Sequence, residues 1–463
     1  MNYTGNKRVA LFVTTLGSFL ITFASSAVNI ALPLIAKELV LDAVALSWIV
    51  TAYYLVWAML ILPFGKLGDI HGRKRIFTLG IVIYVISSLL SALSNSAAML
   101  ISLRILTGIG GAMIYGTGVA ILTSVFPIGE RGKAFGINVA ATYLGLSGGP
   151  FLGGVLTQFF GWRSIFLVNV PVGFIAILLI VWKLKGEWAE AQGEQFDFIG
   201  SIIYSFMIIA IIYGFSILHT IRGVLLFLVG FIGIFAFIRY ERNVRDPVLN
   251  MNLFKNNIIF TFSNLAALVN FSAIHAVSFL ISLYLQYVKG FSPQTAGLIL
   301  VSQPIIIAVV SPFAGRLSDR TDARIVASTG MALTALGLGF FIFLDGGTAL
   351  WFIIMNLVLL GFGFALFSSP NTNAAMSTID RQFYGVALAT LGTMRATGQM
   401  LSMGIATLLF AIYIGRTQIT SEYHELFLMS IRAAFVIFAL LCFSGIFASL
   451  ARGRVREGRL GAS

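Results

Sequence analysis

Four ionisable side chains lie inside long apolar runs of this sequence, where a charge is costly and usually functional. A histidine titrates near neutral pH and could carry a proton there. An arginine keeps its charge, so it would instead tune a partner or order water. We therefore predict that Arg104, His275 and Arg395 take part in proton coupling, and that Arg432 faces the protein interior. The alternative for His275 is a neutral ring that is hydrogen-bonded in a packed core.

Carboxylates are missing from the middle of the apolar runs. All 17 Asp and Glu residues fall in polar connections, in the tails or at the ends of the runs. A positive interior without an anion should disfavour monovalent cations and favour neutral or anionic amphiphiles. The sequence also holds no HExxH motif, no carboxylate pair within an apolar run and no GxxxxGK[ST] loop, and its histidines are scattered. We therefore expect no enzyme, no ATP-driven pump, no metal site and no cofactor.

The composition is that of a membrane protein. The chain of 463 residues is 58% hydrophobic and 10% charged, whereas soluble domains are about 45–50% apolar and about 25% charged. Apolar runs of about 20 residues cross a bilayer as helices. A cleaved signal peptide ending near Ala27 is the alternative for the first run, but that run continues to Ile35. The predicted spans are 9–32, 46–64, 76–93, 98–126, 134–157, 164–182, 198–218, 221–238, 258–285, 295–314, 325–344, 348–371, 385–412 and 427–450.

Basic residues orient these spans. If the chain starts in the cytoplasm, most of its 30 Lys and Arg residues fall in cytoplasmic connections and tails, as the positive-inside rule requires. The predicted external connections carry only Lys37, Arg163, Arg222, Lys289 and Arg416. The net charge of +13 is thus an orientation signal that faces anionic lipid, and nucleic-acid binding is not needed to explain it. We expect a plasma-membrane protein, monomeric, with both termini in the cytoplasm.

A sequence repeat divides the chain. GKLGDIHGRK at 65–74 aligns with GRLSDRTDAR at 315–324, and each copy follows the second span of a block of six. Parallel repeats of this kind build transporters that bind substrate between two halves. The predicted domains are a six-helix bundle at 1–184, two inserted helices at 185–240, and a second six-helix bundle at 241–463 that ends in a short basic tail.

Several motifs along the chain resemble those of the major facilitator superfamily. GKLGDIHGRKR at 65–75 resembles its signature loop, RILTGIGGA at 104–112 its fourth-helix motif, and GLSGGPFLGG at 145–154 its fifth-helix antiporter motif. GWRSIFLVNVPVG at 161–173 and LYLQYVKGFSPQTAGL at 283–298 are similar to stretches of the fourteen-span drug:proton antiporter branch. The resemblance implies an all-α major facilitator fold, with two six-helix bundles and two inserted helices. It also implies a secondary active transporter that exports small amphiphilic compounds by alternating access, coupled to proton influx.

The resemblance assigns roles to particular residues. It implies that the signature loop gates the cytoplasmic side by holding the two halves together, with the residues Gly65, Asp69, Gly72 and Arg73. In the fifth helix, small residues allow close packing and a proline bends the chain. This antiporter-motif helix contains Gly145, Gly149, Pro150, Gly153 and Gly154.

One departure from the family pattern leaves the substrate open. Fourteen-span exporters of this branch often carry an aspartate five residues before the asparagine of the N-x-A-L-P stretch, but the position before Asn29 is Ala24 here. The alternative function is therefore transport of anionic or lipid-like amphiphiles by exchange or facilitated diffusion. Polar residues within the spans are the candidates for the substrate cavity: Asn29, Tyr53, Asn138, Asn270, Gln303 and Gln399.

Overall fold

The computed structural model describes residues 3–453, apart from 219, 250, 256 and 380–383. Within that part of the chain the secondary structure is helical, without a strand. It includes 14 helices that are long and apolar enough to cross a membrane. Each overlaps one of the predicted spans, so the predicted helix number and fold class are confirmed.

Helices before residue 184 form the first half of the molecule. In chain order they are α1 (Tyr3–Leu39), α2 (Ala43–His71), α3 (Arg73–Ala92), α4 (Ala97–Val125), α5 (Ile128–Phe160), and α6 (Ser164–Leu167) with α7 (Asn169–Trp182), which together make the sixth span. The inserted pair follows as α8 (Phe198–Ser216) and α9 (Ile221–Glu241).

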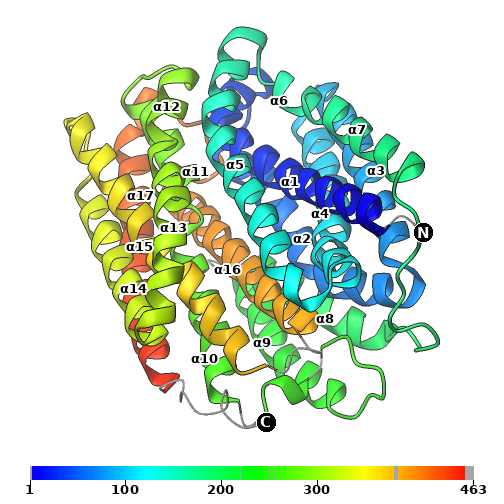
Figure 1. The fold of residues 1–463 in the computed structure, drawn as a ribbon. Coiled ribbons are helices and arrows are strands. Elements are labelled where there is room, and N and C mark those ends of the chain that lie inside the picture. The colour runs from blue at the N-terminus through cyan, green and yellow to red at the C-terminus, as the bar shows by residue number, and fades with distance from the viewer. Residues whose placement is uncertain (1–2, 219, 250, 256, 380–383, 454–463) are drawn as a thin grey trace.

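The second half begins with a broken span. It contains α10 (Ile258–Ile274), α11 (Val277–Leu283) with a π-turn (Tyr284–Val288), α12 (Pro293–Leu300), α13 (Ser302–Arg320), α14 (Ala323–Phe340), α15 (Leu350–Ser377), α16 (Tyr384–Tyr413) and α17 (His424–Ala451). Figure 1 shows this half beside the first one, with α5 next to α12 and α13 where the halves meet.

The two halves repeat one packing device. A side-chain carbon added to Gly80 of α3 would lie 3.0 Å from the Gly110 carbonyl oxygen of α4. The same carbon on Gly330 of α14 would lie 2.6 Å from the Gly363 carbonyl oxygen of α15. Gly80 and Gly330 occupy corresponding positions of the sequence repeat. Close backbone approach at small residues is how apolar helices associate in a membrane, and each half uses it at the same place.

The inserted pair lies against both halves. Tyr204 Oη of α8 donates to the Ala58 carbonyl of α2 at 2.9 Å, and the neighbouring Ser205 Oγ donates to Met59 at 3.1 Å. On the other side, α8 packs along α16. Helix α9 carries many exposed apolar side chains, among them Ile232 at 65% exposure. We therefore expect α9 to face lipid, while α8 contacts the two bundles.

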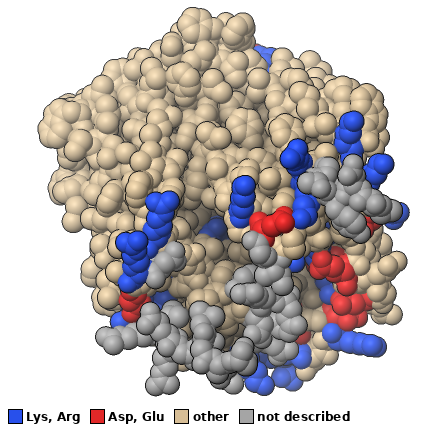
Figure 2. Space-filling view, viewed as in Figure 1, with Lys and Arg blue, Asp and Glu red and all other residues tan. Residues whose placement is uncertain are grey.

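The helices alternate in direction, so the bundle has two distinct ends. We call the end that holds the start of α1, the end of α17 and the connections 71–73, 126–127 and 183–197 the terminal end. The opposite end, with the connections 40–42, 289–292 and 414–423, is the far end. Charged side chains gather over the lower part of Figure 2, and the upper part is mostly apolar or neutral.

Candidate functional site

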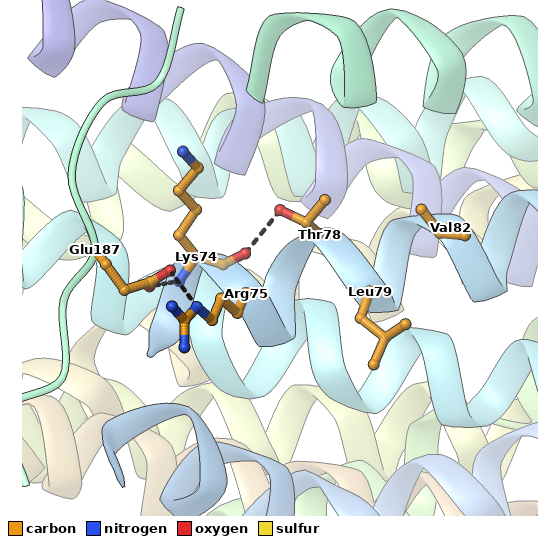
Figure 3. A pocket seen from close by; sticks show the side chains of 6 residues that line it. All are labelled: Lys74, Arg75, Thr78, Leu79, Val82 and Glu187. Carbon is orange, nitrogen blue, oxygen red and sulfur yellow. Dashed lines mark hydrogen bonds and ion pairs between the residues drawn. The ribbon is translucent and has the colours of Figure 1, made fainter. Parts of the chain in front are cut away.

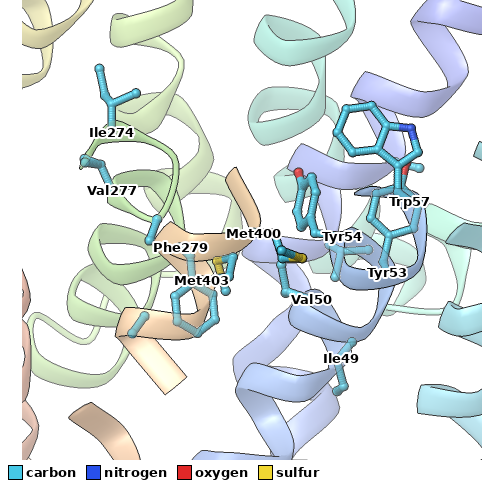
Figure 4. Packing of buried hydrophobic residues seen from close by; sticks show 14 of the residues in the cluster. Ile49, Val50, Tyr53, Tyr54, Trp57, Ile274, Val277, Phe279, Met400 and Met403 are labelled. Carbon is cyan, nitrogen blue, oxygen red and sulfur yellow. The ribbon is translucent and has the colours of Figure 1, made fainter. Parts of the chain in front are cut away.

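An aromatic cluster lies where the halves meet at mid-height. Three members, Tyr53, Tyr54 and Trp57, come from one stretch of α2 (Figure 4). The Trp57 ring lies edge-on to Tyr115 of α4, with centroids 5.1 Å apart. The Tyr54 ring lies edge-on to His275 of the second half, with centroids 4.5 Å apart. The cluster thus joins largely buried aromatic side chains of both halves where the halves meet.

His275 lies at a break in its span. The helix stops at Ile274 and resumes at Val277, and Ala276 N–H donates to Ser402 Oγ of α16 at 2.9 Å. Irregular backbone at membrane depth is tolerated only inside protein or beside a water-filled cavity. The imidazole is partly exposed, and it has no hydrogen-bond partner among the described residues. The structure thus places His275 at the interface of the halves. The alternative interpretation, a histidine that is hydrogen-bonded in a packed core, predicts a hydrogen bond that the described residues do not supply.

Arg104 is enclosed within the first half. Its side chain is 1% exposed, and its Nε donates to the Ile49 carbonyl of α2 at 3.2 Å. The guanidinium lies 4.4 Å from the centroid of the Tyr53 ring, which gives it a cation–π partner. The Tyr53 hydroxyl is buried without a hydrogen-bond partner among the described residues. Arg104 therefore fixes α4 against α2 directly behind the aromatic cluster, and no carboxylate of the described residues forms an ion pair with it.

Arg395 approaches the same region from the second half. Its Nη2 donates to Thr372 Oγ1 of α15 at 2.6 Å, and its guanidinium lies 5.6 Å from the centroid of the Phe271 ring. Its Nε is buried without a partner among the described residues. One turn earlier, Gly392 faces Tyr115 of the first half. A side-chain carbon added to Gly392 would lie 3.0 Å from the Tyr115 ring. The fourth residue, Arg432, lies apart, where its Nε donates to the Leu344 carbonyl at 2.7 Å.

The predicted cavity residues divide into two groups. Asn138 donates to Ser18 Oγ at 3.0 Å within the first half, and Asn270 is 0% exposed, with its amide 3.9 Å from Cys442 Sγ. Both join helices of their own half and do not face the other one. The side-chain oxygens of Asn29, Tyr53 and Gln399, and also that of Asn270, are buried without partners among the described residues. The amide oxygens can still accept a hydrogen bond, and the Tyr53 hydroxyl can accept or donate one. Gln303 is 7% exposed on α13.

The halves are closed against each other at the far end. Ser282 Oγ donates to the Asn29 carbonyl at 2.8 Å, and Gln286 Nε2 donates to the Ile30 carbonyl at 3.0 Å. Nearer the far-end surface, Ala43 N–H donates to the Thr417 carbonyl at 2.9 Å. Each of these bonds joins one half to the other, so the far end forms a continuous seal.

The antiporter-motif helix α5 takes part in this seal. A side-chain carbon on Gly154 would lie 2.6 Å from the Pro293 carbonyl oxygen of α12, and one on Gly297 would collide with the Pro150 carbonyl. On another face of α5, added carbons at Gly145, Gly149 and Gly153 would collide with α1. One face of this helix therefore fits its own half and another face fits the opposite half.

The described contacts between the halves do not extend to the terminal end. The described bonds and ring contacts between the halves lie at the far end or at mid-height, with Gly392 and Tyr115 the nearest to the terminal end. On the terminal side of this level, an added carbon at Gly132 or Gly136 of α5 would have nothing within 4 Å. Among the described residues, the hydrogen bonds that join the two halves thus lie at the far end and at mid-height.

Arg73 organises the predicted gate in the first half. Its side chain is 7% exposed, and its Nε donates to Asp69 Oδ1 at 2.6 Å. Its Nη1 and Nη2 donate to the two oxygens of Glu190 at 2.7 and 3.1 Å, and Nη1 also donates to the Ala120 carbonyl and to Ser124 Oγ. Gly72 lies between α2 and α3 with φ of 115°, a backbone conformation that favours glycine. Gly65 lies close to α4, because a side-chain carbon added to Gly65 would be 3.6 Å from the Gly116 carbonyl oxygen.

The connection 183–196, which we call the strap, supplies the second acid of this network. Arg73 N–H donates to the Trp188 carbonyl at 2.8 Å, and Ala191 N–H donates to the Asp69 carbonyl at 2.9 Å. Lys66 pairs with Glu194. In the described residues the partners of Asp69 and Arg73 come from the first half and the strap, whereas the family resemblance led us to expect contact with the second half. The sequence signal that could have indicated this docking is the presence of three glutamates in the strap, Glu187, Glu190 and Glu194.

Docking of the strap should resist mild acid. Burial would raise the pKa of Glu190, but the charge of Arg73 and the Ser124 hydrogen bond outweigh it and lower that pKa. A carboxyl with a depressed folded-state pKa stabilises the fold above its unfolded pKa of about 4.3 and loses that contribution as the pH falls through the folded value. We therefore expect amide exchange in the strap to stay slow from about pH 7 to about pH 5. Hydrogen–deuterium exchange, corrected for the intrinsic rate, measures this, and the Glu190→Gln variant should exchange faster throughout.

A shallow groove of about 500 Å³ lies on the outer side of α3, away from the interface of the halves. It is lined by Lys74, Arg75, Thr78, Leu79, Val82 and Glu187 (Figure 3). Lys74 N–H donates to Glu187 Oε1 at 2.8 Å, so the strap forms one wall. The groove is thus a feature of the protein surface and does not belong to the central site. Among the described residues no group of three or more His, Cys, Asp or Glu side chains could hold a metal ion.

Comparison with known proteins identifies the family. The model of the Major Facilitator Superfamily matches residues 14–240 and 263–461. The riboflavin transporter RibZ of Clostridioides difficile (strain 630) is 31% identical, over 95% of this chain and 96% of that protein. The multidrug resistance protein Stp of Mycobacterium tuberculosis (strain CDC 1551 / Oshkosh) is 29% identical, over 90% of this chain and 78% of its own. The cephamycin export protein CmcT of Amycolatopsis lactamdurans is 29% identical, over 97% and 94%.

Solved structures agree with the fold. A bacterial homolog of the human lysosomal transporter Spinster, solved in an inward-facing and unoccupied conformation, superposes with a TM-score of 0.67 at 16% identity, over 98% of this chain and 97% of that one. A peptide transporter POT superposes with a TM-score of 0.68, also at 16% identity, over 96% and 98%. With fourteen membrane-length helices, a sealed far end and matches over nearly its whole length, this chain belongs to the Major Facilitator Superfamily and is a transporter, not an enzyme.

Proposed function

We propose that this transporter exports small amphiphilic compounds by alternating access, coupled to proton influx. The observation that carries this proposal is the asymmetry of the interface, since the described hydrogen bonds between the halves lie at the far end and at mid-height. A rocking motion that breaks the far-end bonds and closes the terminal end would expose the aromatic cluster to each side in turn. The named export and resistance proteins among its relatives support the direction of transport.

We further propose that the terminal end faces the cytoplasm across the plasma membrane. The basic connections support this orientation by the positive-inside rule. In the state in which the terminal end is open, the transporter would then admit substrate from the cytoplasm, as export requires. Lys74 and Arg75, which line the groove on α3, would face the anionic lipid headgroups of that leaflet. The proposed protein acts as a monomer, since one chain supplies both halves of the pathway.

The substrate proposed is flat and neutral or anionic. The residues around the mid-height cluster are aromatic or positively charged, and no described carboxylate lies in the middle of a span. Rings such as Tyr54 and Trp57 would stack on a planar ligand, and Arg395 would attract a partial or full negative charge. A relative named as a riboflavin transporter is in keeping with such a ligand. This observation also favours the second candidate function, exchange or facilitated diffusion of anionic or lipid-like amphiphiles without a proton.

His275 is the proposed proton carrier, because it is the one histidine among the described mid-height residues, and the imidazole of a free histidine exchanges its proton near neutral pH. In reconstituted vesicles with an imposed pH gradient, riboflavin and the cationic dye ethidium serve as probes. We expect riboflavin transport to be lost with a protonophore. In the His275→Ala variant, substrate-driven proton flux should fall roughly tenfold or more while exchange of riboflavin continues.

The matched control is His424→Ala, which removes a histidine at the far-end start of α17, outside the signature loop. This variant should couple transport to protons as the unmodified chain does. Riboflavin transport that ignores the protonophore would support facilitated diffusion instead. Transport of ethidium in preference to riboflavin would contradict the proposed substrate class but leave export itself standing.

A further inference from the structure

Two carboxylates lie together where the inserted helix pair begins and ends. Asp197 precedes α8 and is 8% exposed, and Glu241 is the last residue of α9 and is 2% exposed. A side-chain carbon added to Gly200 would collide with both Asp197 Oδ2 and Glu241 Oε1. The two oxygens therefore face the same small space beside Gly200. Neither the signature loop nor the aromatic cluster includes this pair.

Half of the oxygen atoms of this carboxyl pair have donors. Asp197 Oδ1 accepts from Gly200 N–H at 2.8 Å and from Tyr240 Oη at 3.1 Å. Glu241 Oε2 accepts from Leu249 N–H at 3.1 Å. The facing atoms, Asp197 Oδ2 and Glu241 Oε1, are buried and have no partner among the described residues. Each carboxyl is thus fixed in place by donors on its far oxygen, and its near oxygen points at the other carboxyl.

Neighbouring elements supply no positive charge to the pair. Arg239, Arg242 and Arg245 are close in sequence, but the described residues form no ion pair with either carboxylate. The titratable group that contacts the pair is Tyr240 from α9. The neighbouring Asp246, on the connection to the second half, accepts from the N–H of Gln195, two residues before Asp197, at 3.3 Å. Two buried carboxylates this close cannot both be ionised without a counter-charge. A divalent metal would require more oxygen ligands than the two that face each other.

We propose that Asp197 and Glu241 form a proton-binding site, in which one proton is held between Asp197 Oδ2 and Glu241 Oε1. The bound proton fastens the start of α8 to the end of α9. Through the Leu249 N–H bond it also fastens the connection that enters the second half. This site lies outside the path between the halves, so it stands whether or not His275 couples transport to protons.

Infrared spectroscopy of the full-length protein tests the site. At about pH 7, which is roughly three units above the usual Asp and Glu range, the carbonyl stretch of a protonated carboxylic acid should be present. It should disappear in Glu241→Gln and in Asp197→Asn and remain in Asp246→Asn, which changes the neighbouring carboxylate. Absence of the band in the unmodified protein, or its persistence in both variants of the pair, overturns the proposal. So does a band that appears only after a chelator removes a bound cation.

Thermal stability gives an independent readout that does not depend on the Asp197→Asn variant folding. The folded pair binds a proton that the unfolded chain releases near pH 4, so the folded state carries more protons at neutral pH. Stability must therefore fall as the pH rises from about 4, where the unfolded chain titrates, through the titration of the folded pair. Glu241→Gln, whose amide can donate to Asp197 Oδ2, should be folded and should lack this decline. A decline that is identical in Glu241→Gln and the unmodified protein contradicts a shared proton.

Discussion

A Gly154→Val substitution is expected to open the far end of the transporter. An added side-chain carbon at this position would lie 2.6 Å from the Pro293 carbonyl oxygen and 3.1 Å from Gln294 Cα, so the valine cannot fit while α5 and α12 are in contact. Overpacking at such a contact costs about 1–3 kcal/mol. The cost applies only to the state in which the far end is closed. The equilibrium should therefore move toward the state in which the far end is open, by about 5- to 150-fold.

Cysteine accessibility measures this shift. The chain has one cysteine, Cys442, which is buried at 0% exposure and provides a silent background. Thr407 is also 0% exposed in the far-end seal, where its hydroxyl lies 3.1 Å from that of Thr51. A Thr407→Cys reporter should react faster with an impermeant maleimide when Gly154→Val is present. Transport should fall in the same variant, because the state in which the far end is closed becomes rare.

Gly148→Val is the matched control on the same helix. An added carbon at Gly148 meets only Leu152 Cδ1, at 3.9 Å, which is ordinary contact. Reporter labelling and transport should therefore remain as in the unmodified chain. Equal labelling in the Gly154 and Gly148 variants would show that the effect is a general one of bulk on α5, and that the far-end seal does not depend on close approach at Gly154.

The second large effect is expected from Arg73→Ala. The substitution removes the charged donor of Asp69, whose side chain is 29% exposed, and leaves a largely buried carboxylate short of a partner. Such a loss costs about 1–3 kcal/mol. Glu190 is 60% exposed and is solvated once released, so its ion pair adds little to that figure. The stability of Arg73→Lys should lie between that of Arg73→Ala and that of the unmodified protein, because an ammonium cannot donate to both oxygens of Glu190 in the fork geometry of a guanidinium.

Release of the strap is the local signature of this change. Trypsin should cleave the Arg73→Ala variant after Lys185 faster than it cleaves the unmodified protein, and the melting temperature should fall. Arg75→Ala is the control, since Arg75 is 77% exposed and its Nε lies 3.7 Å from Glu187. If Arg75→Ala accelerates cleavage as much as Arg73→Ala does, the strap is held by its general charge and the buried arginine is not its anchor.

The sequence by itself determined the helix number and the repeat. Hydropathy is a local property, and in a bilayer each backbone N–H and C=O must be satisfied within its own helix, so apolar runs read directly as spans. The glycines of α5 were also readable, because small residues four apart leave a face that another helix can approach. The sequence could not tell that Gly154 faces the second half while Gly153 faces α1, since this depends on how the helix is rotated.

Only the tertiary structure decided which polar groups meet. Arg104 could have been expected to seek an acid, but its position on α4 places it over the Tyr53 ring, and Asn270 was directed into its own half beside Cys442. The break at His275 has no proline or glycine to signal it, and is made possible by Ser402 on a distant helix. Arg452, counted with the basic tail, is 1% exposed and donates to Asn371 Oδ1 at 2.9 Å; the rest of that tail lies outside the described residues.

Such contacts join residues of different helices that are far apart in the sequence, and their geometry follows from helix tilt, rotation and register. Asp197 and Glu241 are the clearest case. In the sequence they are two acids at the ends of separate apolar runs, indistinguishable from solvated loop residues. The antiparallel packing of α8 and α9 brings these ends together, and the glycine at position 200 leaves the space in which their oxygens face each other.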